Sequence, residues 1–460
     1  MMQEGMHIHL VGIGGAGLSA IARVLTGLGY RVSGSDCAES ELTAALAAEG
    51  VKVAINHAAA NIDGADILLV SSAIPSANPE IEAARAAGIP ILKRADFLGQ
   101  LLAGRRGIAV AGTHGKTTTT AMLASVLMAA GLDPSFIVGG VLAELGTNAR
   151  AGRGDIFLVE ADEYDRMFLG LTPEVAVLTT VEHDHPDCYP TLEALQDAFR
   201  EFISRLSPDG LLVACLDDPG VRSLGREFAA AGGAVRWYGF GAEAGWRATD
   251  SQPNRAGGSD FVVSRNGLTV GLVRLRVPGR HNILNALATI VVADWLGIPF
   301  ETVRSTLTDF RGVGRRFEIK SEVAGVVIVD DYAHHPTEIK ATLSAARERF
   351  PGRRIWAVFQ PHTYSRTRAL MDEFARAFID ADEVIVLDIF PAREIDTLGV
   401  SAQELVTRMA HRRAQYIGSR HAAADYLAAS LRPGDVLLTL GAGDGYMVGE
   451  WVLNALENQS

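Results

Sequence analysis

Two glycine-rich loops, at residues 12–17 and 112–118, each join an apolar run to a helical pattern. A strand, a tight glycine turn and a helix begin a βαβ unit, in which the next strand lies parallel to the first. Apolar runs and helical patterns keep alternating after both loops, and the alternation restarts a third time near residue 320. The sequence therefore predicts three consecutive α/β domains built on parallel sheets.

The outer two domains are expected to be Rossmann-like, and the central domain to be like a P-loop ATPase. We place the domains at residues 1–104, 105–318 and 319–460, with the polar GRRG segment at 104–107 as a linker. One stretch of the central domain departs from the alternation. Residues 261–277, FVVSRNGLTVGLVRLRV, predict a β-hairpin that turns at Asn266-Gly267.

The composition excludes several classes of protein. Asp and Glu outnumber Lys and Arg by 54 to 42, and the resulting net charge of −12 argues against a general nucleic-acid binder. Apolar runs such as 326–329 are too short to span a bilayer, and the start of the chain lacks the basic and apolar regions of a signal peptide. Three scattered cysteines form neither an even disulfide framework nor a zinc spacing. We expect a cytoplasmic protein, monomer or homodimer, that binds no nucleic acid and enters no membrane.

The first glycine loop predicts a diphosphate site. Gly12, Gly14 and Gly17 fit the pattern GxGxxG directly after an apolar strand, and Asp36 ends the next strand, where a ribose-binding acid is expected. Glycines let backbone amides approach a diphosphate, and the helix N-terminus stabilises its charge. NAD and a nucleotide sugar such as a UDP-sugar present nearly the same anion, so both stay open here. Glycines that serve only close strand–helix packing are the alternative.

The second loop predicts an ATP site. It reads GxxGKT between an apolar strand and a helix, with Val110 where the longer P-loop pattern has its first glycine. Lys116 would neutralise β- and γ-phosphate charge, the Thr117 hydroxyl would bind magnesium, and the backbone amides would surround the phosphates. A solvated turn is the alternative. The candidate residues of this loop are Gly112, Thr113, His114, Gly115, Lys116, Thr117 and Thr118.

Acidic groups follow the next two strands of the same domain. Glu160, Asp162 and Glu163 end the run DIFLVEADE, and residues 182–187 read EHDHPD. Carboxyl ends of parallel strands meet at one edge of a sheet, so these groups are expected beside the P-loop. An oxygen-rich set with one imidazole and no cysteine favours magnesium over zinc.

Ten segments in this order resemble the Mur ligase family of peptidoglycan synthesis over essentially the whole chain. They are VGIGGAGLSAIA, VSGSD, SSAI, AGTHGKTTTT, VEADE, EHDH, GRHNILNALA, GVGRRFE, DDYAHHPTEIKATL and FQPHTYSRTR. The resemblance implies an ATP-dependent carboxylate–amine ligase with magnesium, whose first domain binds a UDP-sugar.

The resemblance also implies a role for each matching position. The UDP-sugar would contact Gly14, Gly15, Gly17, Asp36, Ser71 and Ser72. ATP would additionally contact Asn282, Asn285, Arg316 and Asp331, and the metal would be held by Thr117, Glu160 and His185. The amino acid and the transferred phosphate would meet Tyr332, His334, His362 and Arg366. Catalysis would rest on Lys116, Glu160, His185, His334 and Arg366.

One departure from most of the family narrows the reaction. Family members that add the second and later amino acids carry a carbamoylated lysine where this chain has Arg200, and no lysine lies between Lys116 and Lys320. The alanine-adding members also lack it. The implied reaction joins L-alanine to the carboxylate of UDP-N-acetylmuramate through an acyl phosphate, for cell-wall synthesis and hence cell shape and division.

Other functions stay open at this point. VEADEYD resembles the family members that attach a tripeptide to the same sugar nucleotide during recycling. An NAD-dependent oxidoreductase and a non-enzymatic ATP-binding switch are more distant alternatives. The group that takes the amine proton could be His334, Glu163 or Asp162.

The P-loop assignment gives a first prediction. Lys116→Ala should abolish ATP-dependent phosphate release, because it removes the charge that faces the β- and γ-phosphates, while UDP-N-acetylmuramate should still bind. Phosphate release and sugar-nucleotide binding are measured on the same preparation. Near-normal turnover of the variant would show that this loop does not bind the ATP phosphates.

Overall fold

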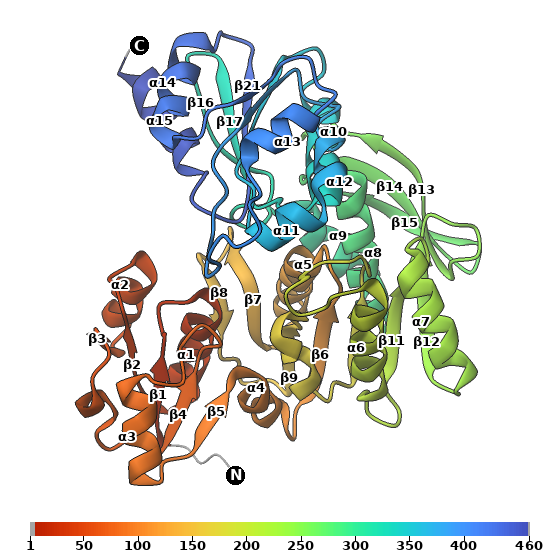
Figure 1. Cartoon of the computed structure of the whole chain (residues 1–460). Coiled ribbons are helices and arrows are strands. Elements are labelled where there is room, and N and C mark those ends of the chain that lie inside the picture. The colour runs from red at the N-terminus through yellow and green to blue at the C-terminus, as the bar shows by residue number, and fades with distance from the viewer. Residues whose placement is uncertain (1–4, 459–460) are drawn as a thin grey trace.

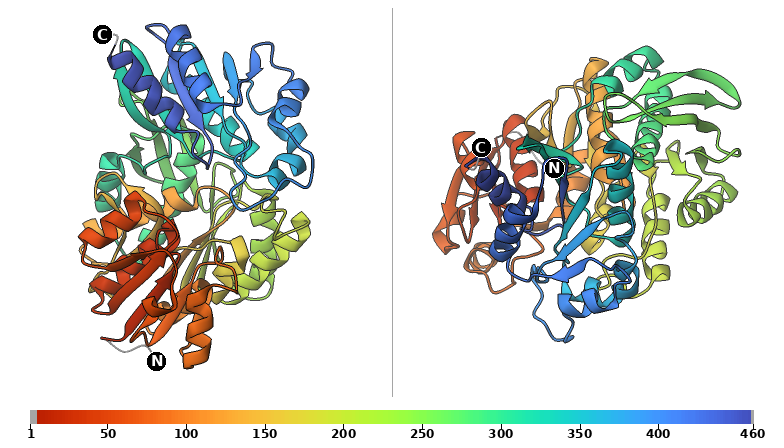
Figure 2. Two further views of the ribbon diagram at one scale, coloured as in Figure 1. Left: turned by 60° about the vertical axis from the view of Figure 1, so that its left-hand side comes forward. Right: turned by 90° about the horizontal axis from the view of Figure 1, so that it is seen from above.

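The computed structural model describes residues 5–458, and these form three separate sheets of five, ten and six strands. Each sheet is flanked by helices, which confirms the predicted series of three α/β domains (Figure 1). In Figure 1 the C-terminal domain lies above the central domain, and the N-terminal domain lies beside the central domain. Figure 2 shows the same arrangement from two other sides.

The N-terminal sheet is entirely parallel, with the strand order β3-β2-β1-β4-β5. The order reverses at β1, and ligands of such sheets bind outside the carboxyl ends of the strands at this point. The glycine loop 12–17 lies there, between β1 and α1. The elements are β1 (His7–Val11), α1 (Ala16–Gly27), β2 (Arg31–Asp36), α2 (Glu41–Ala48), β3 (Lys52–Ile55), η1 (Ala59–Ile62), β4 (Ile67–Val70), α3 (Pro79–Ala87), β5 (Ile91–Lys93) and α4 (Arg94–Leu102).

The predicted GRRG linker is wrong in its second half. Arg106 begins β6 and lies opposite Ile156 in the central sheet. Its guanidinium binds Glu174 at 2.8 Å, and Gly107 packs against Leu102 and Pro173. Polar composition suggested a loop, but the strand pairing and the ion pair, both made by distant residues, extend the strand.

The central sheet has the order β15-β14-β13-β12-β11-β10-β6-β9-β7-β8. Strands β13 to β7 in this order are parallel, and antiparallel strands extend the sheet at both edges. The strands are β6 (Arg106–Ala111), β7 (Ser135–Leu142), β8 (Thr147–Arg150), β9 (Ile156–Glu160), β10 (Val175–Leu178), β11 (Leu211–Cys215), β12 (Ala234–Gly239), β13 (Trp246–Pro253), β14 (Ser259–Arg265) and β15 (Leu268–Arg274). The helices are α5 (Lys116–Ala129), η2 (Tyr164–Gly170), α6 (Leu192–Ser204), α7 (Pro219–Ala230), α8 (Arg280–Trp295) and α9 (Phe300–Asp309).

The predicted hairpin is confirmed as β14 and β15. Asn266 and Gly267 have φ values of 49° and 82°, the left-handed pair that a two-residue hairpin turn requires. Helix α8 begins at Arg280, so Asn282 and Asn285 lie in its first turns.

The C-terminal sheet has the order β16-β17-β21-β18-β19-β20 and is parallel except for β16. Helices α10, α12 and α13 pack on one face and α14 and α15 on the other. The polar edge strand β16 was not predicted, because EIKSEV lacks an apolar run. The elements are β16 (Glu318–Val323), β17 (Val326–Asp331), α10 (Pro336–Arg349), β18 (Ile355–Phe359), α11 (Tyr364–Ala369), α12 (Met371–Ala375), β19 (Glu383–Val386), α13 (Ala402–Arg408), β20 (Ala414–Tyr416), α14 (Arg420–Ser430), β21 (Val436–Leu440) and α15 (Met447–Glu457).

Within residues 5–458, no helix combines the length and the apolar character needed to cross a bilayer.

A buried carboxylate connects the strands of the N-terminal domain. Glu80, in the first turn of α3, is 0 % exposed and accepts hydrogen bonds from Ser35 Oγ and Asn61 Nδ2, both at 2.6 Å. His9 Nε2 lies 3.6 Å from Glu80 Oε2, the oxygen that accepts the Ser35 hydroxyl. Burial alone would raise the pKa of Glu80, but the interactions with His9, Ser35 and Asn61 outweigh it and lower the pKa to about 2.

Glu80→Gln should therefore destabilise this domain at neutral pH, by up to about 3 kcal/mol. A lowered carboxyl pKa stabilises the fold above its unfolded value near 4.5, and this stabilisation is lost as the pH falls toward 2. The difference between variant and wild type should shrink over that interval. Hydrogen exchange of the amides of β1 and β2 measures this difference in the stability of the N-terminal domain. Glu82→Gln, on the exposed side of the same helix, is the control, and a difference independent of pH would contradict the charge assignment.

Candidate active site

The P-loop lies between β6 and α5, and two of its glycines are sterically required. Gly112 has φ +132° and Gly115 has φ +82°. A Cβ at Gly112 would overlap Thr179 Oγ1, and one at Gly115 would lie 2.6 Å from Asn285 Oδ1. Helix α5 begins directly afterwards at Lys116, so its free N-terminal amides face the loop and favour an anion there.

Lys116 folds back onto the loop and toward the strand that follows it. Its Nζ donates to the carbonyl oxygens of Gly112 and Thr113 and lies 2.8 Å from Glu163 Oε2. Burial opposes the charge of Lys116, but the carboxylates of Glu163 and Asp162 outweigh burial and raise its pKa. Lys116 is therefore a cation at neutral pH.

The predicted metal ligands lie in one cavity but in two contact groups. Thr117 Oγ1 donates to Glu160 Oε1 at 2.9 Å, and Glu160 Oε2 accepts the Gly139 amide at 2.6 Å. His185 has φ +54°, and its Nε2 lies 3.8 Å from Glu163 Oε1. All of them line the same cavity. This set of oxygens with one imidazole fits a magnesium ion.

That cavity has a volume of about 680 Å³ and is lined by all three domains. Gly17 and Arg94 come from the N-terminal domain, and the P-loop and the acidic groups come from the central domain. The C-terminal domain adds the four residues predicted to meet the amino acid. Basic side chains gather around it from every side: Arg94, Lys116, Arg315, Arg316, Arg366 and Arg393. Acidic side chains line the same cavity: Glu160, Asp162, Glu163, Asp184, Asp187, Glu338 and Glu394. A ligand that carries several negative charges would therefore bind through the six basic groups and a metal ion.

The four C-terminal residues lie together, two from the segment after β17 and two from the start of α11 and the residues before it. Arg366 is 4 % exposed, and its Nε donates to Asp184 Oδ1 at 2.7 Å while its Nη1 donates to the His362 carbonyl oxygen. The His334 ring lies edge-on to Tyr332 and to His362 at 5.3 and 6.0 Å. Burial lowers the pKa of His334 to about 3 and that of His362 to about 4, so both imidazoles are neutral.

A second cavity, of about 150 Å³, lies between the central and C-terminal domains. It contains the other predicted nucleotide contacts: His114, Gly115, Thr117, Thr118, Asn282, Asn285, Arg316 and Asp331. Asn285 Nδ2 donates to Asn282 Oδ1 at 3.1 Å, which fixes the orientation of both amides on α8. Burial raises the pKa of Asp331 to about 6. Arg316 lines both cavities and so connects them.

The predicted sugar-nucleotide residues stand at the carboxyl ends of β1, β2 and β4. Asp36 Oδ2 accepts the Gly14 amide at 2.8 Å, so this acid braces the glycine loop. Ser71 follows β4 and lies against Gly12, where an added Cβ would be 3.1 Å away. Of the six predicted residues, Gly17 lines the larger cavity, while Gly14, Gly15, Asp36, Ser71 and Ser72 are not among the residues that line it.

Sequence reasoning missed the charged residues Arg94 and Glu338, and it placed Asp184 among the acids beside the P-loop without its partner. Arg94 donates to Asp162 Oδ2 at 2.9 Å and lies so close to Gly17 that a side chain there would overlap it. Asp184 is the buried partner of Arg366, and Glu338 lies within 3.7 Å of Arg316. Arg94 directly follows a parallel strand, a position that could have singled it out. The other two depend on contacts between domains.

Comparison with known proteins agrees with this architecture. The model of the Mur ligase family catalytic domain matches residues 7–106, that of the Mur ligase middle domain matches 110–293, and that of the Mur ligase glutamate ligase domain matches 315–443. UDP-N-acetylmuramate–L-alanine ligase of Geobacter sp. (strain M21) is 46% identical over 98% of this chain and 97% of that protein. The enzyme of the same name from Solibacter usitatus is 46% identical over 100% and 97%.

Solved structures show the same relation. UDP-N-acetylmuramate–alanine ligase of Thermotoga maritima superposes with a TM-score of 0.84 at 30% identity, over 99% of this chain and 100% of that one. A murein peptide ligase of Psychrobacter arcticus gives a TM-score of 0.73 at 26% identity, over 99% of both chains. Because full-length relatives share nearly half of its residues, the chain belongs to the Mur ligase family.

Proposed function

We propose that this Mur ligase joins L-alanine to the carboxylate of UDP-N-acetylmuramate and converts ATP to ADP and phosphate. The observation that carries the proposal is the larger cavity, in which Gly17 of the N-terminal glycine loop, Lys116 and Arg366 meet from three domains. The full-length relatives named for this reaction support it. The product is UDP-N-acetylmuramoyl-L-alanine, a step in peptidoglycan synthesis.

Each domain has its own ligand in this proposal. The domain at residues 1–104 binds the UDP moiety through Gly14, Gly15, Gly17, Asp36, Ser71 and Ser72. The domain at 105–318 binds the ATP phosphates through residues 112–118 and the adenine beside Asn282 and Asn285. The domain at 319–460 closes the smaller cavity with Asp331 and presents Tyr332, His334, His362 and Arg366 to the amino acid.

The chemistry requires charge neutralisation and positioning. A carboxylate reacts with an amine once the γ-phosphoryl group has been transferred to it, because phosphate then leaves in place of oxide. Lys116, Arg316 and Arg366 line the cavity where the transferring phosphoryl group and the tetrahedral intermediate concentrate negative charge. Removal of one such cation should cost about 10²–10³ in rate.

Thr117 and Glu160, with His185 in the same cavity, would hold magnesium, which would neutralise phosphate charge when bound. Glu160 is oriented for this by the Gly139 amide, which occupies its second oxygen.

Glu163 is the proton acceptor that the electrostatics favour. Burial raises the pKa of its carboxyl, whereas burial lowers the pKa of His334 to about 3. Burial also acts to raise the pKa of Asp162, but Arg94 and Lys116 outweigh it and lower the pKa. A base works best with a pKa near the operating pH, and burial moves the pKa of Glu163 in that direction. Lys116 contacts both oxygens of Glu163, so the carboxylate would accept the amine proton once the ATP phosphates engage Lys116.

Recycling of a tripeptide is the second candidate. VEADEYD and the similarity to the murein peptide ligase of Psychrobacter arcticus support it. The higher TM-score and identity of the alanine-adding structure favour L-alanine.

A panel of amines should decide between the two. We expect phosphate release from ATP and UDP-N-acetylmuramate to rise with L-alanine, and less with glycine or L-serine. Stimulation by the tripeptide alone would replace the main proposal by recycling. Reduction of NAD with no phosphate release would contradict both.

Arg94 should contribute to binding of the sugar nucleotide, because it reaches the glycine loop at Gly17 and faces the larger cavity. Arg94→Ala should weaken UDP-N-acetylmuramate binding about tenfold or more and leave ATP binding unchanged. Arg85→Ala, an exposed arginine of the same domain, is the control in a calorimetric titration. Equal affinity of the Arg94 variant and wild type would remove this residue from the binding site.

A further inference from the structure

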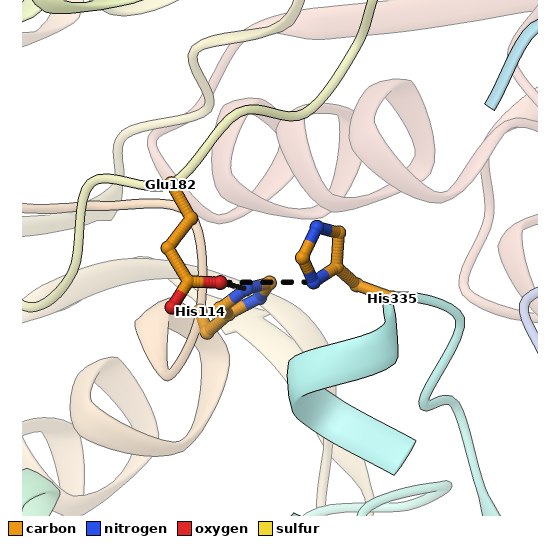
Figure 3. Close-up of side chains that lie close together, drawn as sticks. All are labelled: His114, Glu182 and His335. Carbon is orange, nitrogen blue, oxygen red and sulfur yellow. Dashed lines mark hydrogen bonds and ion pairs between the residues drawn. The ribbon is translucent and has the colours of Figure 1, made fainter. Parts of the chain in front are cut away.

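His114, Glu182 and His335 form a cluster between the P-loop and the C-terminal domain (Figure 3). His114 belongs to the P-loop, Glu182 to the segment after β10, and His335 precedes the first residue of α10. The steps described above use the backbone of the P-loop at His114 and none of these three side chains. Their imidazole and carboxylate groups are therefore free for another role.

The distances among the three groups approach those of a tetrahedral zinc site. His114 Nε2 lies 3.3 Å from Glu182 Oε2, and His335 Nδ1 lies 3.8 Å from the same oxygen. The three ligand atoms lie within 4.8 Å of one another. Ligand atoms bound to one zinc ion at about 2.0–2.1 Å are roughly 3.3 Å apart. The His114–Glu182 distance already has this value, and the other two distances must contract when the ion binds.

The outer nitrogens of both imidazoles are already oriented. His114 Nδ1 lies 3.2 Å from Glu338 Oε1, and His335 Nε2 lies 3.4 Å from the His183 carbonyl oxygen. A metal-binding histidine usually donates its second ring N–H to a carboxylate or a backbone carbonyl, which fixes the tautomer and directs the free nitrogen to the metal. Both histidines of the cluster have such a partner. The Thr337 hydroxyl also donates to Glu182 Oε2 at 2.6 Å and holds the carboxylate in place.

We propose that His114, Glu182 and His335 bind a transition-metal ion of the Zn²⁺ class and thereby connect the P-loop to α10. Two imidazoles with one carboxylate are a zinc donor set, whereas magnesium prefers a set in which oxygen ligands predominate. The ion is distinct from the magnesium assigned to Thr117 and Glu160, and water completes its four-coordinate shell.

The binding step balances in charge and in protons. Burial opposes the charge of His114, but Glu182 and Glu338 outweigh it and raise the pKa of the imidazole to about 9, so Nε2 of His114 must release a proton to solvent before it bonds to the ion. Nδ1 of His335 and the ionised Oε2 of Glu182 carry no proton and bond to the ion directly. The long hydrogen bond of 3.3 Å from the Thr337 amide to His335 Nδ1 is given up. The ion then links the central domain, through His114 and Glu182, to the C-terminal domain, through His335. It adds to the ion pairs between these domains and favours their present arrangement.

The test is calorimetric titration of the full chain with ZnCl₂ in excess Mg²⁺ and without substrates, so its outcome is independent of the proposed reaction. We expect one Zn²⁺ site per chain, and at least tenfold weaker binding by Glu182→Gln and by His335→Gln. His411→Gln is the matched control, because His411 contacts the Ala381 carbonyl oxygen instead, and it should bind Zn²⁺ as wild type does. With Co²⁺, wild type should show the visible absorption of tetrahedral coordination, and both variants should lose it.

Absence of Zn²⁺ binding, or binding that neither variant weakens, would overturn the proposal. His335→Asn is a second variant at this position, because an asparagine at the start of α10 can still accept the Thr337 amide while it removes the imidazole. Thermal unfolding of all variants verifies that they fold. Folded variants with unchanged Zn²⁺ affinity would assign the ion to another place in the chain.

Discussion

The C-terminal domain is held to the central domain by charged groups that are almost completely buried. Arg366 and Asp184, each 4 % exposed, form an ion pair at 2.7 Å across this interface. Desolvation of two charges is expensive, and loss of either partner would leave the other buried and unpaired. The pair therefore strongly constrains the relative orientation of the two domains. Both cavities depend on this orientation, because residues of both domains line each of them.

Carboxylates neutralise the cations of the site in the structure described here. Glu163 faces Lys116, Glu338 faces Arg316 and His114, and Asp162 faces Arg94. Phosphate and carboxylate groups of the substrates carry the same sign of charge as these partners. In our proposal, substrates would therefore compete with the protein's own acids for the cations. An acidic chain can thus present six basic side chains to a cavity that acidic side chains also line.

Much of the fold could be predicted from the sequence, because it is encoded locally. Alternating apolar runs and helical patterns indicated the three α/β domains, and Asn266-Gly267 indicated the hairpin through the left-handed backbone that both residues adopt. The wrong or missing predictions concern segments whose secondary structure depends on residues far away in the sequence. Arg106 joins a strand because it pairs with Ile156 and Glu174, and the polar strand β16 exists because β17 provides its hydrogen bonds.

The candidate site likewise has parts that the sequence predicted and parts that it did not. The order of residues alone determined the two glycine loops and the acids that follow parallel strands, since a glycine turn and the end of a strand are properties of a short segment. Only the tertiary structure decided that Arg94 reaches Gly17, that Asp184 pairs with Arg366, and that His114, Glu182 and His335 converge. These contacts join segments far apart along the chain, and their geometry follows from the packing of whole domains, which no local pattern encodes.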